Sequence, residues 1–161
     1  MHNVRIILHI SFIQCLLYGV SLCAQEDSLS LQKGNYDVEL IDSLLFEAIV
    51  KERKKVDLPG LFKSSEMRKS AKDHVDQISV KNQLFYKEYR KGQCLADIPI
   101  QNMSLSHQEV VNQILNKWLA SSGHKDLILG PLFIYGASAT KFHLVGGQLY
   151  LKAVFYVSYN P

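Results

Sequence analysis

Residues 118–129, WLASSGHKDLIL, form the stretch that most narrows the fold. Trp118, the only Trp of the chain, closes an apolar helical run, and a Ser-Ser-Gly-His segment separates it from a second apolar run. Gly123 is the residue type that commonly follows a helix end, where a positive φ is needed. The stretch therefore predicts a helix that ends just before Gly123, followed by a turn that presents His124.

Three helices are predicted upstream of this turn, each from apolar side chains that recur at helical spacing. In the nearest, Ser106 and Glu109 have the spacing of a capping box. The second lies within residues 64–82, where His74 falls on or beside the apolar face. The first begins near Asp37, a plausible N-cap, and ends before Pro59. Their apolar faces hold, in chain order, Ile41, Leu44, Leu45, Ala48 and Ile49; Met67, Ala71, Val75 and Ile78; and Val111, Ile114, Leu115 and Trp118.

The C-terminal part of the chain changes to a strand pattern. Residues 149–157 alternate with period two, and residues 132–139 are a predicted partner strand. Gly146 and Gly147 suit a tight antiparallel turn. Residues 83–102 are less regular and predict a short helix followed by an extended piece. Because helices come first and strands last, we expect an α+β fold in which helices flank a central antiparallel sheet.

The N-terminus has the pattern of a secretory signal peptide in residues 1–24. A short basic start is followed by a long apolar run and a small-residue site, so cleavage is expected after Ala24 and the protein is predicted to be exported. Cys23 offers the alternative of a lipoprotein box, but Leu22 is too large for the position before such a cysteine. Residues 25–36 are polar and predict a flexible arm before a domain at 37–161.

After cleavage Cys94 is the only cysteine left, so no intrachain disulfide is expected. Residues 25–50 hold six acidic residues against one Lys, whereas residues 51–91 hold twelve Lys and Arg against six Asp and Glu. The basic middle allows contact with an anionic lipid or polysaccharide surface, but a set of solvated helix faces is the favoured explanation. Nucleic acid is not expected as a partner, because Lys dominates and no stripe of Arg and aromatic residues accompanies it.

The ordered set of elements resembles the CAP superfamily, that is, cysteine-rich secretory proteins, antigen 5 and pathogenesis-related 1 proteins, and most closely its bacterial branch without disulfides. The segments that carry the resemblance are DLPGLFKSSEMRKSAKDHVDQIS at 57–79, WLASSGHKDLIL at 118–129, LFIYGASA at 132–139 and GGQLYLKAVFYV at 146–157. The resemblance covers roughly residues 41–158 and implies an α-β-α sandwich with a central antiparallel sheet.

The resemblance also implies a cavity, which in some family members binds a divalent metal through two His and two acidic residues. Only His124 matches that set cleanly. Tyr86 stands near the second His, Asp97 supplies a carboxylate only after a one-residue slip, and Ser121 stands where other branches have Glu. His74 is either a third donor or a hydrogen-bonded core residue. We therefore expect a degraded site with no bound metal and no cofactor.

Two classes of function follow from these residues. The first is a non-enzymatic binding module for a small apolar molecule, a lipid, a glycan or a protein. The second is a hydrolase that uses His124 with Asp97 and a metal, or His124 with Cys94 as a thiol nucleophile. The missing ligands favour the first class, and the sequence identifies neither the ligand nor the oligomeric state.

Overall fold

A computed structural model describes residues 36–87 and 92–160, which belong to one compact unit, Asn35–Pro161. Its elements, in chain order, are α2 (Val38–Lys54), β1 (Phe62–Lys63), α3 (Ser65–Val80), β2 (Gly92–Pro99), α4 (His107–Leu119), α5 (Ser122–Ile128), β3 (Tyr135–Val145) and β4 (Gln148–Ser158). The predicted signal peptide and all but one residue of the predicted arm fall outside the described residues. Among the described helices, none is long and apolar enough to cross a membrane.

Within the described residues, the sheet has four strands in the order β1-β3-β4-β2. β3 and β4 form an antiparallel hairpin, and the predicted Gly146-Gly147 turn is confirmed, with φ values of 55° and 82°. β2 pairs antiparallel with β4. Two features differ from the prediction. The partner strand predicted at 132–139 lies at Tyr135–Val145, and β1 is a two-residue strand that pairs parallel with β3. The sheet is therefore mixed, and the predicted α+β class is confirmed.

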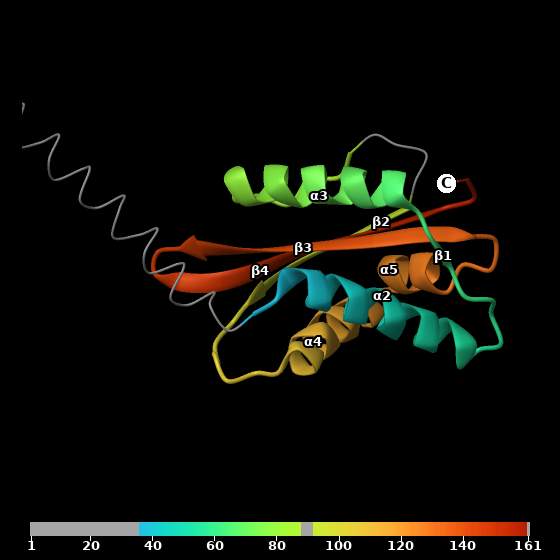
Figure 1. The fold of residues 1–161 in the computed structure, drawn as a ribbon, viewed down its shortest axis with the longest axis horizontal. Coiled ribbons are helices and arrows are strands. Elements are labelled where there is room, and N and C mark those ends of the chain that lie inside the picture. The colour runs from blue at the N-terminus through green and yellow to red at the C-terminus, as the bar shows by residue number, and fades with distance from the viewer. Residues whose placement is uncertain (1–35, 88–91, 161) are drawn as a thin grey trace, which may run out of the picture. The chain divides into compact units, whose positions relative to one another are not determined.

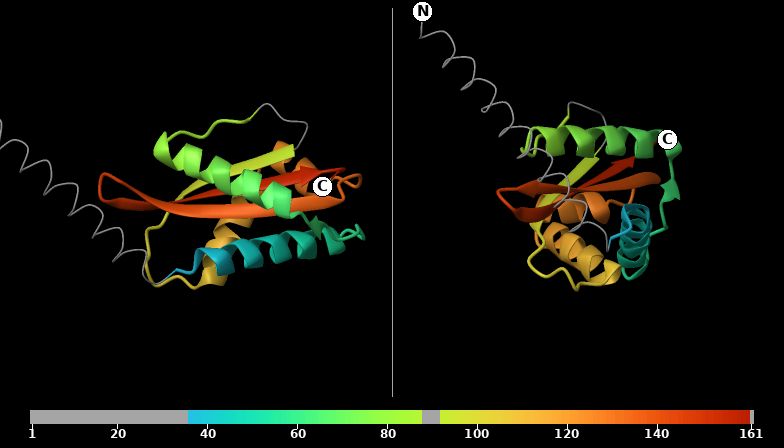
Figure 2. Two further views of the ribbon diagram at one scale, coloured as in Figure 1. Left: turned by 45° about the horizontal axis from the view of Figure 1, so that its top comes forward. Right: turned by 60° about the vertical axis from the view of Figure 1, so that its left-hand side comes forward.

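Helices cover both faces of the sheet, as Figures 1 and 2 show. α3 packs on one face, where Leu95, Val154 and Tyr156 join its apolar side chains in a buried cluster. α2, α4 and α5 lie on the other face, where the Trp118 ring meets Phe155 at a centroid distance of 6.1 Å. Because alternate strand residues point to opposite faces, neighbouring residues of β2 and β4 serve different layers. Both faces are thus buried, and even Lys152 of β4 has no exposed surface.

The predicted helix starts are found in the structure. The Asp37 side chain accepts hydrogen bonds from the backbone N–H groups of Glu39 and Leu40. Ser64 caps α3, and Ser106 with Glu109 forms the expected capping box of α4. Such caps satisfy backbone donors that have no partner inside the helix, so these local signals fix where each helix begins.

One local prediction was wrong, and a second is tested only in part. Gly123 does not adopt a positive φ; α4 ends at Leu119, the backbone extends at Ser121, and Gly123 lies inside the next helix, α5. α5 begins without an intervening loop, and its first turn already has a backbone hydrogen bond, from Lys125 N to Ser121 O at 2.9 Å. The short helix expected within residues 83–102 is not found at 83–87, and residues 88–91 lie outside the described part. The extended piece is β2.

Candidate functional site

Tyr86 and His124 are the predicted site residues that the structure brings together. The Tyr86 hydroxyl and His124 Nε2 are 3.1 Å apart and hydrogen-bonded. The Gln93 side chain anchors the segment that carries Tyr86, because its amide exchanges two hydrogen bonds with the Lys87 backbone, at 3.0 and 2.7 Å. Partial burial lowers the pKa of His124, which favours a neutral imidazole at neutral pH. Tyr86 and His124 thus form a hydrogen-bonded polar pair at the surface.

Cys94 contacts the main chain of His124 but is not poised as a nucleophile. The residue has no exposed surface. Its Sγ donates to the backbone oxygen of His124 at 3.8 Å, so the contact involves the main chain of His124. Burial raises the pKa of the Cys94 thiol to about 12. Since the thiolate is the reactive form of cysteine, this thiol is chemically quiet at neutral pH.

Asp97 points away from His124, to the opposite face of the sheet. Gly92 and Cys94 of β2 face α5, as their contacts with Leu127 and the His124 backbone show. Asp97 has the other parity on the same strand, and its Oδ2 pairs with Lys152 Nζ at 2.6 Å. The structure therefore does not bring Asp97 to the Tyr86–His124 pair, and the pairing of Asp97 with His124 proposed for a hydrolase lacks its geometry.

His74 lies on the face of the sheet that α3 covers, and it is fully buried. Its Nε2 is 2.9 Å from the Phe85 carbonyl oxygen, and its Nδ1 is 2.8 Å from the Tyr156 hydroxyl. A carbonyl can only accept, so Nε2 carries the proton and Nδ1 accepts from Tyr156. Burial lowers the pKa of His74, and both ring nitrogens are engaged. Of the two interpretations given for His74, the geometry matches the hydrogen-bonded core residue.

Ser121 precedes the first turn of α5 as its N-cap residue, yet its side chain makes no capping hydrogen bond. It is half-buried and lies three residues before His124. Within the described residues, no group of three or more His, Cys, Asp or Glu side chains is arranged to hold a metal ion. The chemistry available here is hydrogen bonding and aromatic contact at Tyr86 and His124.

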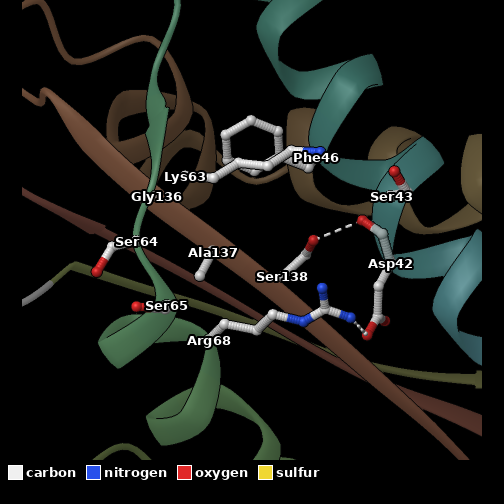
Figure 3. Close-up of a pocket in the computed structure, with 10 residues that line it drawn as sticks. All are labelled: Asp42, Ser43, Phe46, Lys63, Ser64, Ser65, Arg68, Gly136, Ala137 and Ser138. Carbon is white, nitrogen blue, oxygen red and sulfur yellow. Dashed lines mark hydrogen bonds and ion pairs between the residues drawn. The ribbon is translucent and has the colours of Figure 1, made fainter.

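The sequence prediction missed a cavity on another part of the fold. It has a volume of about 260 Å³ and lies where α2, the start of α3, β1 and β3 meet (Figure 3). Its lining residues are Asp42, Ser43, Phe46, Lys63, Ser64, Ser65, Arg68, Gly136, Ala137 and Ser138. Asp42 is buried, although it is a carboxylate. One signal was present: Asp42 immediately follows Ile41 at the edge of the apolar face of the first helix.

The fold of the described residues matches solved structures of CAP proteins. An outer surface protein from Borrelia burgdorferi superposes with a TM-score of 0.58 and 15% identity, covering 76% of this chain and 96% of that chain. The structure of MpPR-1i superposes with a TM-score of 0.58 and 16% identity, covering 76% of this chain and 90% of that chain. No protein-family model matches the sequence, and the search of curated proteins gives no match.

These likenesses define the class of protein to which the fold corresponds. The predicted resemblance is confirmed at the level of the fold: helices flank a four-stranded sheet as they do in CAP, or SCP, domain proteins. At identities of 15 and 16% the likeness extends to the fold alone. The role of any side chain must therefore be argued from this chain itself.

Proposed function

We propose that the protein is an exported CAP-fold binding protein without enzymatic activity, which recognises a small apolar, lipid, glycan or protein ligand. The observation that carries this proposal is the state of the reactive groups. The Cys94 thiol is buried with a raised pKa, both nitrogens of His74 are engaged, and Asp97 is paired with Lys152 on the opposite face from His124. Catalysis by any of these groups would require that it first break an internal contact.

The surface around Tyr86 and His124 suits recognition. Tyr86 is 62% exposed and offers an aromatic face together with a hydroxyl group. His124 beside it is half-buried and carries no charge that a ligand would need to neutralise. Aromatic side chains with a polar tip contribute apolar contact and a hydrogen bond at the same position. Export is supported by the signal-peptide pattern and by the fold shared with an outer surface protein.

Zinc binding and thiol reactivity together test the proposal. After dialysis against zinc, elemental analysis of the purified protein should find less than one equivalent, with the same value in the His124→Ala variant. The Cys94 thiol should resist alkylation in the folded protein and react after unfolding in guanidinium chloride. Stoichiometric zinc that is lost in His124→Ala, or rapid alkylation of the folded protein, would show that a reactive centre exists.

Contact of residues 51–91 with an anionic surface forms a second part of the proposal. The end of α2 carries the exposed side chains of Lys51, Lys54 and Lys55, of which Lys55 pairs with Glu52. Exposed charges attract anions in a salt-dependent manner. Binding to vesicles with anionic lipid should therefore weaken as salt rises and be absent with neutral lipid. Vesicle binding that is indifferent to salt would count against this contact.

A further inference from the structure

The cavity beside α2 contains a buried carboxylate oxygen that lacks a hydrogen bond. Asp42 is only 3% exposed. Its Oδ1 accepts from the Thr140 hydroxyl at 2.7 Å, and its backbone oxygen accepts from Ser138 Oγ at 2.7 Å. Its Oδ2 has no hydrogen-bond partner among the described residues, and the nearest cation, Arg68 Nη2, is 3.8 Å away. Buried carboxylate oxygens are rarely left without a donor, because the cost of desolvation is then uncompensated.

Cationic groups surround the same cavity. Lys63 lines it with its ammonium group 5.2 Å from the Phe46 ring centroid, and it pairs with no carboxylate in the described part of the chain. The Arg68 side chain is 44% exposed; it pairs with Glu39 and reaches towards Asp42 (Figure 3). α3 begins at Ser65, and its N-terminal dipole adds positive potential. A buried acceptor and exposed cations therefore face one small space.

We propose that this cavity binds a small organic acid that carries a hydroxyl or amino group beside its carboxylate. The ligand carboxylate lies against Lys63 and Arg68, and the neighbouring O–H or N–H donates to Asp42 Oδ2. The apolar remainder packs on Phe46 and Ala137, which also line the cavity. A volume of about 260 Å³ holds roughly nine non-hydrogen atoms, if each takes about the 30 Å³ of a water molecule in the liquid.

This site is separate from the Tyr86–His124 pair and does not depend on what that pair does. Its residues come from α2, β1, α3 and β3, whereas Tyr86 follows α3 and His124 lies on α5. None of its lining residues was a candidate from the sequence. If the Tyr86–His124 pair proved catalytic, the cavity at Asp42 would still be expected to bind its organic acid.

Three matched probes test the proposal by calorimetric titration of the purified protein at about pH 8. At this pH the Asp42 carboxyl, whose pKa burial raises to about 7, is ionised and Oδ2 is an acceptor. Leucate has a carboxylate, a neighbouring hydroxyl and a branched apolar body; isocaproate lacks the hydroxyl; the amide of leucic acid lacks the charge. We expect leucate to bind with saturation and isocaproate about tenfold more weakly, since it leaves Asp42 Oδ2 without its donor. The amide should also lose about tenfold or more, since a neutral group replaces the one facing Lys63 and Arg68.

Two variants locate the binding. Asp42→Asn is isosteric but turns an acceptor into a donor, so it should abolish the preference for leucate over isocaproate. Arg68→Gln should weaken both carboxylates. The matched controls on α3 are Asp73→Asn and Lys69→Gln, which alter exposed residues outside the cavity and should leave all three affinities unchanged.

The proposal is overturned if leucate binds wild-type protein no more tightly than isocaproate, or if neither binds with saturation. It is equally overturned if folded Arg68→Gln binds leucate with wild-type affinity. Circular dichroism establishes that each variant is folded. Should Asp42→Asn fail to fold, the comparison of the three probes on wild-type protein still decides the matter.

Discussion

The surface around His124 and the cavity around Asp42 differ in how their polar groups are satisfied. At the first, Tyr86 occupies His124 Nε2 and the Cys94 thiol is buried against the main chain of His124. At the second, a buried carboxylate keeps one oxygen without a hydrogen bond beside exposed cations. The sequence stretch that is most informative about the fold, residues 118–129, therefore does not contain the buried carboxylate oxygen of the cavity that lacks a hydrogen bond.

The largest effect is expected at Arg53, which ties the chain after α5 to α2. Its buried guanidinium donates to the backbone oxygens of Pro59, Ile128, Gly130 and Phe133, at 2.8–3.2 Å. Arg53→Met leaves these carbonyls without that donor, so the free energy of unfolding should fall by about 3 kcal/mol or more. Urea unfolding measures the loss.

The neighbouring substitution Lys54→Met is the control, because Lys54 is exposed and should change stability by less than about 0.5 kcal/mol. If the free energy of unfolding falls by less than about 1 kcal/mol in Arg53→Met, the hydrogen bonds of Arg53 do not fix the end of α5, the helix that carries His124. The two regions would then be less firmly connected than the hydrogen bonds indicate.

Asp42 should produce a pH-dependent effect of the next size. Burial raises its pKa from 3.8 to about 7. Thr140, Arg68 and Lys72 lower the pKa, and Glu39 raises it further. The folded state therefore holds the proton more tightly, and stability falls as pH rises from about 4 to about 7. Asp42→Asn removes this penalty, which is at most about 4 kcal/mol.

Thermal unfolding at several pH values checks this prediction. The variant should be more stable than wild type at about pH 8, and the difference should shrink towards about pH 4. Asp73→Asn, the exposed control, should show no such trend. A difference that is constant with pH would show that the Asp42 carboxyl is not strained by its burial.

His74 should show the opposite pH sign. Burial lowers its pKa from 6.5. Neutral His74 therefore contributes its full share to folding stability above about pH 6.5, and this contribution is lost as pH falls below that value. His74→Phe also deprives Phe85 O and the Tyr156 hydroxyl of a partner, at a cost of about 1–3 kcal/mol. Urea unfolding across this pH range should show a smaller acid-induced loss in the variant. An unchanged acid-induced loss would contradict the assignment.

The smallest effect is expected at Tyr86. Tyr86→Phe removes one exposed hydrogen bond to His124, so stability should change by less than about 0.5 kcal/mol. Thermal unfolding measures the change, and the His124 side-chain NMR signals should move because the bond to Nε2 is lost. A loss above about 1 kcal/mol would mean that the Tyr86–His124 pair supports the fold, in the manner of Arg53.

Much of the fold could be predicted because its signals are local. Caps at Asp37 and Ser106 and the Gly146-Gly147 turn each depend on a few neighbouring residues. The parallel pairing of β1 could not be predicted, since two residues carry no periodicity. Gly123 misled the prediction because a glycine after an apolar run marks an end only when no second helix follows at once.

The candidate site was harder to predict, because it depends on which faces meet. Tyr86 and His124 are hydrogen-bonded across 38 positions of the chain, a distance that no local pattern covers. The position of Asp97 relative to Cys94 follows from parity, because residues three apart on one strand face opposite sides. The cavity at Asp42 forms only when α2, α3 and β3 pack together, and no local sequence pattern predicts that packing.

Two statements are central: the cavity at Asp42 binds a small organic acid, and His124 binds no metal ion. The most direct test is one set of amide NMR spectra of isotope-labelled protein, titrated with leucate and, separately, with zinc. The account predicts that leucate shifts the amides of residues 136–138 with saturation, and that zinc leaves the signals of Tyr86 and His124 in place. Saturable shifts at His124 with zinc, while residues 136–138 ignore leucate, would contradict it.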